Sequence, residues 1–409
     1  MKILVINAGS SSIKYQLCLM QDEVVLAKGG IERIGSDSAI LTHQTVYKPE
    51  VREVSEILDH TAAIRVMLKA LVHAEYGAIQ SITEIDGAGH RVVHGGETFS
   101  GSTLVTPEVK HEIKRLFDLA PLHNPANLSG ILAMEANLPN LPQAVVFDTA
   151  FHQTMPEKVY LFPIPMVLYR KHKIRRYGFH GTSHEYVSNR AAQLLNRSLE
   201  DLKVISCHIG NGVSCTAIMN GRSFDTSMGL TPLDGLMMGT RSGDIDPAVV
   251  PFTMIQEDLT MNEVSSMLNK HSGLLAISGL SSDMRDIEEA MAAGHPPARL
   301  AFDMYEYRLR KYIGAYAAGM NGLDVLVFTA GVGENSNLLR KVVCSQLTFL
   351  GVQLDEELND NNNAQSRVIS RVDSRVAVAV VPTNEELMIA ISTYDLIANQ
   401  ANPLERGAE

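Results

Sequence analysis

Residues 1–18 read MKILVINAGSSSIKYQLC and place a short polar segment between two apolar ones. The apolar runs Ile3–Ile6 and Ile13–Leu19 flank a bend of small polar residues, a pattern typical of a β-hairpin rather than an amphipathic helix. Gly9 permits a tight turn, and serine hydroxyls beside exposed backbone N–H groups could surround a phosphate that Lys14 meets with positive charge. The bend therefore has two interpretations, an anion-binding site or an ordinary serine-rich turn. It matches neither GxxxxGK[ST] nor GxGxxG.

The composition is that of a globular protein with room for two or three domains in its 409 residues. The 35 Lys and Arg against 46 Asp and Glu give a net charge of −11, which argues against a nucleic-acid or anionic-membrane partner. Four cysteines without metal-site spacing predict buried free thiols and a reducing compartment: Cys18, Cys207, Cys215 and Cys344. Neither a signal-peptide pattern nor a membrane-length apolar run is present, so we expect a cytoplasmic location.

The second half of the chain echoes the opening pattern. Val204–Ile209, the bend Gly210–Gly212 and Val213–Met219 again give strand, glycine bend and strand, which suggests an internal duplication, although the match is short. Ala144–Phe147 has the continuous apolar character of a buried parallel strand, and Asp148 follows it directly. An α/β fold with ligands at the carboxyl ends of the strands is therefore expected.

Two further local predictions come from periodicity and glycine placement. Apolar spacing predicts a helix over Ser55–Tyr76. The segment 330–335 follows the buried strand Val325–Thr329 and is predicted to be a glycine bend that opens a helix from Ser336, where backbone N–H groups can approach a phosphate.

Glycine bends after strands, acids at strand ends and scattered cations are the parts of a nucleotide-dependent phosphoryl-transfer site. Four residues offer positive charge for the transferred group: Arg91, Arg241, His180 and Lys14. Three offer oxygen ligands for magnesium: Asp148, Glu385 and Asn7.

Each of these residues also has a simpler interpretation. Either arginine can be a structural ion-pair partner. His180 and His184 have the i,i+4 spacing of a zinc pair, but without a glutamate between them and with a glycine in the segment. Glu385 and Glu386 can be first-turn acids that the helix dipole favours. Asp148 is the stronger candidate, because an ionised side chain beside a buried strand needs a partner.

Three of these stretches, Val5–Lys14, Asp148–His152 and Tyr177–His184, resemble signatures of the acetate kinase (acetokinase) family, and the resemblance runs from about Lys2 to Ala398. The family belongs to the acetate and sugar kinase/Hsc70/actin superfamily. The resemblance implies an α/β fold of two duplicated ribonuclease-H-like (actin-like ATPase) domains facing across a cleft. It implies an N-terminal domain of residues 1–150 completed by helix 385–400, and a nucleotide-binding domain of residues 151–384.

The resemblance also implies reversible, direct in-line phosphoryl transfer between ATP and acetate, giving acetyl phosphate and ADP, with Mg²⁺ or alternatively Mn²⁺, in a homodimer. It assigns catalysis to Asp148, His180 and Arg241. It assigns substrate binding to Arg91, Val93, Leu122, His123, Phe179 and Pro232. It assigns nucleotide binding to Lys14, His208, Ile209, Gly210, Asn211, Gly212, Asp283, Met284, Arg285, Gly331, Val332, Gly333, Glu334 and Asn335. The metal is assigned to Asn7 and Glu385.

Acyl-chain preference is less sharply defined. The apolar pocket for the methyl group would contain Val93, but one methylene is worth only about 1 to 3 kcal/mol in such a pocket, so propionate kinase is the alternative on the same scaffold. Ala330 and Gly331 are small and favour ATP over pyrophosphate as donor. An alternative from another class is an actin-like or chaperone-like ATPase that acts on a protein partner.

Overall fold

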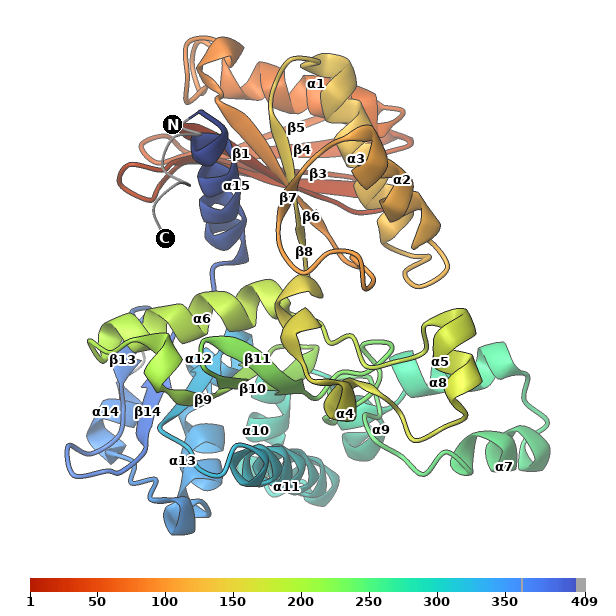
Figure 1. Ribbon diagram of the computed structural model, residues 1–409, viewed down its shortest axis with the longest axis vertical. Coiled ribbons are helices and arrows are strands. Elements are labelled where there is room, and N and C mark those ends of the chain that lie inside the picture. Colours follow the sequence, from red (N-terminus) through yellow and green to blue (C-terminus); the bar gives the residue numbers. More distant parts are fainter. Residues whose placement is uncertain (362, 402–409) are drawn as a thin grey trace. The chain divides into compact units, whose positions relative to one another are not determined.

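The computed structural model describes residues 1–361 and 363–401 and divides into two compact units. The first unit is Met1–Phe151 together with the chain from Asn384 onward, and the second is His152–Thr383. Each unit is built on its own β-sheet (Figure 1). Within the described ranges, no helix has both the length and the apolar character that crossing a membrane would take.

The sheet of the first unit has eight strands in the order β5-β4-β3-β2-β1-β6-β8-β7. Their bounds are β1 Lys2–Ala8, β2 Ser12–Leu19, β3 Val24–Glu32, β4 Ser36–Thr45, β5 Val51–Ile57, β6 Gly87–Val92, β7 Thr103–Leu104 and β8 Gln143–Phe147. β1 and β2 form the predicted antiparallel hairpin, which is confirmed. β1 also pairs with β6 in parallel, and β6 pairs with β8 in parallel, so three carboxyl ends lie at one edge.

Helices cover both faces of this sheet. They are α1 His60–Leu71, η1 Ile82–Glu84, α2 Pro107–Arg115, α3 Asn124–Asn137 and α15 Glu385–Ala401, with η2 Ala150–Thr154 at the boundary of the units. On β6, Ala88 belongs to the hydrophobic cluster under α1 and α3, whereas a Cβ at Gly89 would lie 2.3 Å from Thr393 Oγ1 of α15. Because neighbouring residues of a strand point to opposite faces, α15 packs on the face opposite α1.

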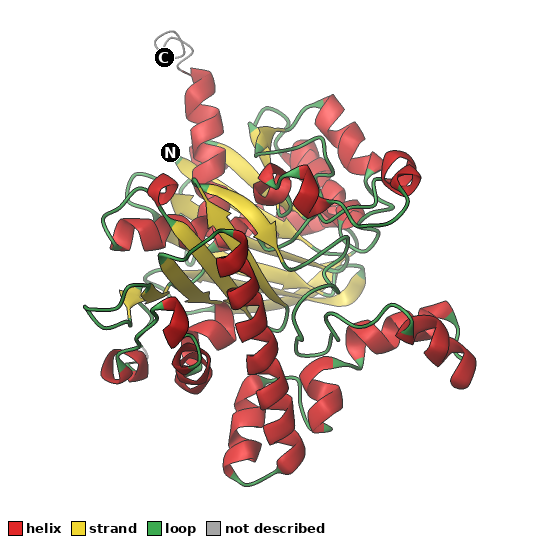
Figure 2. Cartoon of the chain, turned by 60° about the horizontal axis from the view of Figure 1, so that its bottom comes forward, coloured by secondary structure: helices red, strands yellow, loops and turns green. Residues whose placement is uncertain are grey.

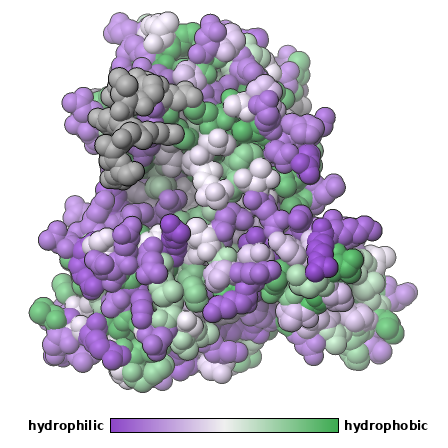
Figure 3. All heavy atoms as spheres, in the orientation of Figure 1, coloured by the Kyte–Doolittle hydropathy of each residue, from purple (hydrophilic) through white to green (hydrophobic). Residues whose placement is uncertain are grey.

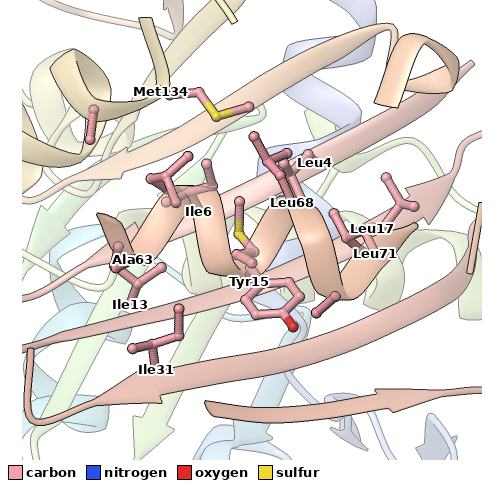
Figure 4. Close-up of a cluster of buried hydrophobic side chains, with 14 of the residues drawn as sticks. Leu4, Ile6, Ile13, Tyr15, Leu17, Ile31, Ala63, Leu68, Leu71 and Met134 are labelled. Atoms are coloured by element: carbon pink, nitrogen blue, oxygen red, sulfur yellow. The ribbon is translucent and has the colours of Figure 1, made fainter. Parts of the chain in front are cut away.

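The core between the sheet and α1 explains why the opening hairpin is so apolar. Figure 4 shows Ile6 and Tyr15 from the hairpin close to Leu68 of α1, and Met134 of α3 reaching the same cluster. All four are buried. Each Å² of apolar surface removed from water stabilises the fold by roughly 25 cal/mol. Burial of this cluster therefore holds the hairpin against α1 and fixes the bend at its end.

The predicted helix over 55–76 is wrong at its start. β5 continues to Ile57 and pairs with β4. Ile57 fits the apolar spacing of the predicted helix, but it belongs to the sheet. Asp59 then caps α1 by accepting a hydrogen bond from the N–H of Ala62. The helix ends at Leu71, not Tyr76.

The second unit repeats the central topology of the first. Its sheet has the order β11-β10-β9-β12-β14-β13. The bounds are β9 Lys203–Ile209, β10 Val213–Met219, β11 Arg222–Thr226, β12 Val325–Thr329, β13 Arg367–Val368 and β14 Ala377–Val380. In the second unit, β9, β10 and β11 pair antiparallel, and β12 and β14 then follow β9 in parallel. The first unit has the same pattern, with β1, β2 and β3 antiparallel and β6 and β8 parallel to β1. The suggested internal duplication is confirmed.

The second unit carries most of the helices seen in Figure 2. They are α4 Glu157–Tyr160, α5 Met166–His172, α6 Gly181–Leu194, η3 Leu199–Asp201, α7 Val249–Gln256, α8 Met261–Lys270, α9 Gly273–Ser278, α10 Met284–Ala292, α11 Pro296–Gly319, α12 Ala330–Asn335, α13 Asn337–Ser345, η4 Thr348–Leu350 and α14 Glu356–Asp360. All four cysteines are buried free thiols, as predicted.

The segment 330–335 is not the predicted glycine bend but the short helix α12. Three contacts support helical backbone there: Asn335 donates to the carbonyl of Gly331, and the buried Arg340 guanidinium donates to the carbonyls of Gly333 and Glu334. The following helix, α13, begins at Asn337, with Ser336 as its cap.

Candidate functional site

Arg91 and Asp148 meet at the carboxyl edge of the first sheet. Arg91 lies on β6 beside Val146 of β8, and Asp148 follows the end of β8. Arg91 Nη2 is 3.0 Å from Asp148 Oδ2, and Asp148 is only 1% exposed. The prediction that Asp148 has a partner is confirmed.

Glu385 joins this pair from the first residue of α15. Its Oε2 is 3.7 Å from Arg91 Nε. Burial, and next the charge of Asp148, raise the pKa of Glu385 to about 7, although Arg91 opposes the shift. Asp148 in turn raises the pKa of Arg91. The simple interpretation of Glu385 as a solvated first-turn acid is therefore incomplete.

The charges of this cluster suit a bound cation. Two carboxylates face one guanidinium, and Glu386 adds a further acid that also raises the pKa of Glu385. A divalent cation would relieve the excess negative charge, and carboxylate and amide oxygens are the ligands that magnesium takes in proteins. Asp148, Glu385 and the amide of Asn7 are thus chemically appropriate to hold one.

Asn7 and Lys14 lie opposite each other on β1 and β2. Both line a cavity of about 240 Å³ in the first unit, together with Lys28 and Glu386. The bend that joins these strands is closed by a hydrogen bond from the N–H of Gly9 to the carbonyl of Ser12. Lys14 of the hairpin and Lys28 of the neighbouring strand β3 give this cavity the positive charge that a phosphate requires.

The predicted acyl pocket is divided between the two units. Val93 is buried and follows β6, whereas Leu122 is 79% exposed and precedes α3 together with His123. Phe179, which is buried, and Pro232 belong to the second unit. The residues are therefore not grouped within either unit alone.

His180 and Arg241 converge in the second unit. His180 occupies the N-cap of α6 with a left-handed backbone, φ 56°, and its Nδ1 lies 2.9 Å from Ser214 Oγ. Its ring stacks on that of His208 with centroids 4.0 Å apart. A Cβ at Gly212 would lie 3.3 Å from Arg241 Nη1 and 3.5 Å from His180 Cε1, so the glycine leaves both side chains room to approach.

The zinc interpretation of His180 and His184 is wrong. His184 Nδ1 is 2.9 Å from Ser206 Oγ and its Nε2 is 2.7 Å from Ser214 Oγ, so both ring nitrogens are engaged by hydroxyls. Burial, followed by the charges of neighbouring histidines, keeps its pKa well below the usual range. Among the residues that the structure describes, no group of three or more His, Cys, Asp or Glu side chains is arranged around a metal position.

Sequence reasoning missed the residues that shape the loop carrying Arg241. Asp244 accepts a hydrogen bond from the N–H of Gly235 at 2.8 Å and donates its own N–H to the carbonyl of Gly235, also at 2.8 Å. Tyr312 of α11 donates to the second carboxylate oxygen of Asp244. Within this closed loop, Arg241 Nη1 donates to the carbonyl of Pro232 at 3.3 Å, and burial lowers the pKa of Arg241. The glycines and acids around Arg241 were the available signal.

A cavity of about 770 Å³ in the second unit brings together the three predicted nucleotide segments. Its predicted lining residues are Gly210, Asn211, Asp283, Met284, Arg285, Gly331, Val332 and Asn335. Ser282, Glu288 and Ser336 also line it and were not predicted. The volume suits a nucleotide-sized ligand.

Five predicted nucleotide-binding residues of the second unit do not line this cavity: His208, Ile209, Gly212, Gly333 and Glu334. His208 and Ile209 end β9, and Gly333 packs so that a Cβ on it would lie 3.6 Å from Ile209 Cβ. Glu334 accepts a hydrogen bond from the N–H of Thr383 at 3.1 Å. Gly212 lies beside Arg241, as described above.

Comparisons with known proteins agree with this arrangement. The model of the acetokinase family matches residues 2–391. An acetate kinase of Symbiobacterium thermophilum is 60% identical over 400 residues, which are 98% of this chain and 100% of that protein. An acetate kinase of Thermotoga petrophila is 56% identical over 399 residues, 97% of this chain and 99% of that protein.

Solved structures show the same relationship. Acetate kinase of Porphyromonas gingivalis superposes with a TM-score of 0.94 at 49% identity, covering 97% of this chain and 99% of that one. A propionate kinase from Francisella tularensis gives a TM-score of 0.88 at 42% identity, with the same coverage. The fold is therefore the duplicated actin-like ATPase fold of these kinases. Since the family model and the relatives span nearly the whole chain, the protein belongs to the acetokinase family and is a kinase that transfers phosphate to acetate.

Proposed function

We propose that this protein transfers the γ-phosphoryl group of ATP directly and reversibly to acetate, with Mg²⁺. The observation that carries this proposal is the nucleotide-sized cavity of about 770 Å³, around which three segments distant in sequence come together. The cluster of acids around Arg91 in the first unit supports this proposal. The Arg91 guanidinium can bind a substrate carboxylate, and candidate metal ligands lie beside it.

The chemistry needs charge neutralisation and alignment more than a base. Acetate is ionised at neutral pH, so its oxygen can attack phosphorus without losing a proton. A bond forms between that oxygen and the γ-phosphorus while the bond from phosphorus to the β–γ bridging oxygen breaks, and ADP leaves with the electron pair. We assign the equatorial oxygens to Arg241 and His180, and the acetate carboxylate to Arg91.

Asn7 and Glu385, with Asp148 beside them, would hold the cation. Mg²⁺ bound there supplies positive charge to the phosphate oxygens. Glu385 must be ionised for this role, and the raised pKa of its side chain places that ionisation near neutral pH. Lys14 is assigned to a nucleotide phosphate, which its position beside Asn7 supports.

Acetate is the preferred acceptor and propionate the weaker alternative. Val93 is buried next to the loop that follows Arg91, where its branched side chain would restrict a longer acyl chain. ATP is the proposed donor, since Gly331 carries no side chain and a Cβ placed on it would have no atom within 4 Å.

A homodimer is also proposed, through the second unit. Large apolar side chains are exposed on α7 and at the start of α8: Val249, Phe252, Ile255 and Met261. Figure 3 shows hydrophobic surface in this region. The cytoplasmic location expected from the sequence stays a prediction, and so do the domain limits implied by the family resemblance.

The proposal is tested by measuring magnesium-dependent ADP production with acetate, propionate, butyrate or no acceptor, in the presence of hydroxylamine. Hydroxylamine converts an acyl phosphate into a hydroxamate. We expect turnover to require a short acyl acceptor, with acetate the best and acetohydroxamate as product. Equal ADP release without an acceptor would instead support an ATPase, and a higher kcat/KM for propionate would reassign the substrate.

A further inference from the structure

Asn127 lies within the first turn of α3 and uses both ends of its side-chain amide on separate segments of the first unit. Its Oδ1 accepts a hydrogen bond from the N–H of Val93 at 3.1 Å. Its Nδ2 donates to the carbonyl of Ala8 at 2.7 Å. The residue is 3% exposed, so neither bond is readily replaced by water.

The two segments that Asn127 joins are not joined by the sheet at that point. β1 and β6 are parallel neighbours, but their paired register ends at Ile6 and His90. Ala8 and Val93 lie beyond this last pair: Ala8 is still paired with Ile13 of β2, whereas Val93 directly follows the end of β6. The side chain of Asn127 thus connects β1 to the segment after β6 where the two strands no longer share backbone hydrogen bonds.

Each joined segment leads into a different part of the proposed site. Ala8 precedes the bend of the opening hairpin, next to Asn7. Val93 stands two residues after Arg91 and belongs to the predicted acyl pocket. The helix also approaches Ala8 closely, because a Cβ at Gly130 would lie 2.6 Å from the Cβ of Ala8. The contact between α3 and this edge is therefore tightly packed.

We propose that Asn127 is a positioning residue that holds the acetate-binding segment in register with the phosphate-binding bend. This inference rests on the proposed function, since it takes the roles of the two segments from there. An amide is suited to the task because it presents one acceptor and one donor in a fixed geometry. An apolar residue of similar size would leave a buried N–H and a buried carbonyl unsatisfied.

Asn124 provides a matched control on the same turn of α3. It is also fully buried, and its amide is also used at both ends. Its Oδ1 accepts from the N–H of His94 at 3.1 Å, and its Nδ2 donates to the carbonyl of the same residue at 3.0 Å. Asn124 therefore holds only the loop after β6 and makes no bridge to Ala8.

The test compares Asn127→Asp with Asn124→Asp. Asn127→Asp retains the acceptor for Val93 but places a carboxylate oxygen against the carbonyl of Ala8. We expect it to raise the KM for MgATP about tenfold, in line with the loss of one buried hydrogen bond. Asn124→Asp should raise the KM for acetate and leave the KM for MgATP within twofold.

Thermal unfolding of both variants separates a kinetic change from a general loss of stability. A residue that only stabilises the fold would lower Tm in Asn127→Asp without the selective change in the KM for MgATP. The inference is overturned if that KM is unchanged, or if both variants show the same pattern. If Asn127→Asp does not fold, Asn127→Ser, which is smaller and neutral, is measured in its place. The same rise in the KM for MgATP is expected.

A measurement on the wild-type chain covers the case in which neither Asn127 variant folds. Hydrogen exchange is followed in a peptide that spans Val93, with and without MgADP. Slower exchange on nucleotide addition is expected, because the bend and this segment are joined; unchanged exchange overturns the inference. Wild-type ADP production that does not depend on an acceptor would refute the proposed function instead, so the two failures are distinguishable.

Discussion

Replacing Glu385 with glutamine should stabilise the first unit at alkaline pH. The pKa of Glu385 is raised from 4.5 to about 7, mainly by burial and then by Asp148. The folded protein thus holds this proton more tightly than the unfolded chain does, and the free energy of unfolding falls as the pH rises between these values. At about 1.36 kcal/mol for each pKa unit, a rise from 4.5 to about 7 corresponds to a loss of about 3 kcal/mol above pH 7.

That loss is absent when the side chain cannot ionise. The side chain of Glu385 is 24% exposed, so about 3 kcal/mol is an upper value. Relative to wild type, Glu385→Gln should gain up to this amount between about pH 4.5 and pH 8, while losing metal-dependent turnover. A stabilised variant that is catalytically impaired is the usual signature of a functional residue held at an energetic cost.

The measurement is urea unfolding at both pH values, with Glu386→Gln as the control. The control keeps Glu385 and should therefore retain most of the pH-dependent loss of stability, because burial and Asp148 contribute more than Glu386 to the raised pKa of Glu385. Saturating Mg²⁺ at the higher pH should stabilise wild type but not Glu385→Gln, because binding to the folded state alone raises its stability. If the unfolding free energies of wild type and Glu385→Gln change in parallel with pH, ionisation of Glu385 does not destabilise the fold.

Two further predictions concern the second unit. Gly239→Ala would place a Cβ 2.1 Å from Asn211 Oδ1 at the nucleotide cavity. We expect the KM for ATP to rise about tenfold, because Asn211 would have to move and the nucleotide would fit the cavity less well. An unchanged KM in steady-state assays would be inconsistent with a nucleotide site there. Tyr312→Phe removes the hydroxyl that donates to Asp244; kcat should fall by about three- to tenfold because the loop bearing Arg241 is less fixed, and a wild-type kcat in an otherwise stable variant would contradict this role.

Local sequence pattern was sufficient for several strands and for the charged residue after β8, but it missed β5. The opening hairpin and Asp148 follow from apolar runs, a glycine bend and a charge after a buried strand. The duplication was visible as two similar bends, but it needed the strand order of both sheets to become clear.

Properties that depend on distant partners were not available from the sequence. The high pKa of Glu385 arises from burial and from Asp148, which is far away in the chain. Asn127 reads as an ordinary polar residue of a helix until Ala8 and Val93 are seen on either side of it. The contacts of the short helix 330–335 likewise include a residue outside it, Arg340, which donates to the carbonyls of Gly333 and Glu334.

In the proposed reaction Arg91 binds the acceptor carboxylate and Arg241 stabilises the transferring phosphoryl group. These two roles are separated by the steady-state kinetics of Arg91→Gln and Arg241→Gln with acetate and MgATP. We predict that Arg91→Gln raises the KM for acetate by at least about tenfold, since a charged hydrogen bond to the ground-state substrate is lost. Arg241→Gln should lower kcat by about a hundredfold or more with little change in either KM. If both variants retain the wild-type kcat and the wild-type KM for acetate, neither arginine belongs to the site and the account is wrong.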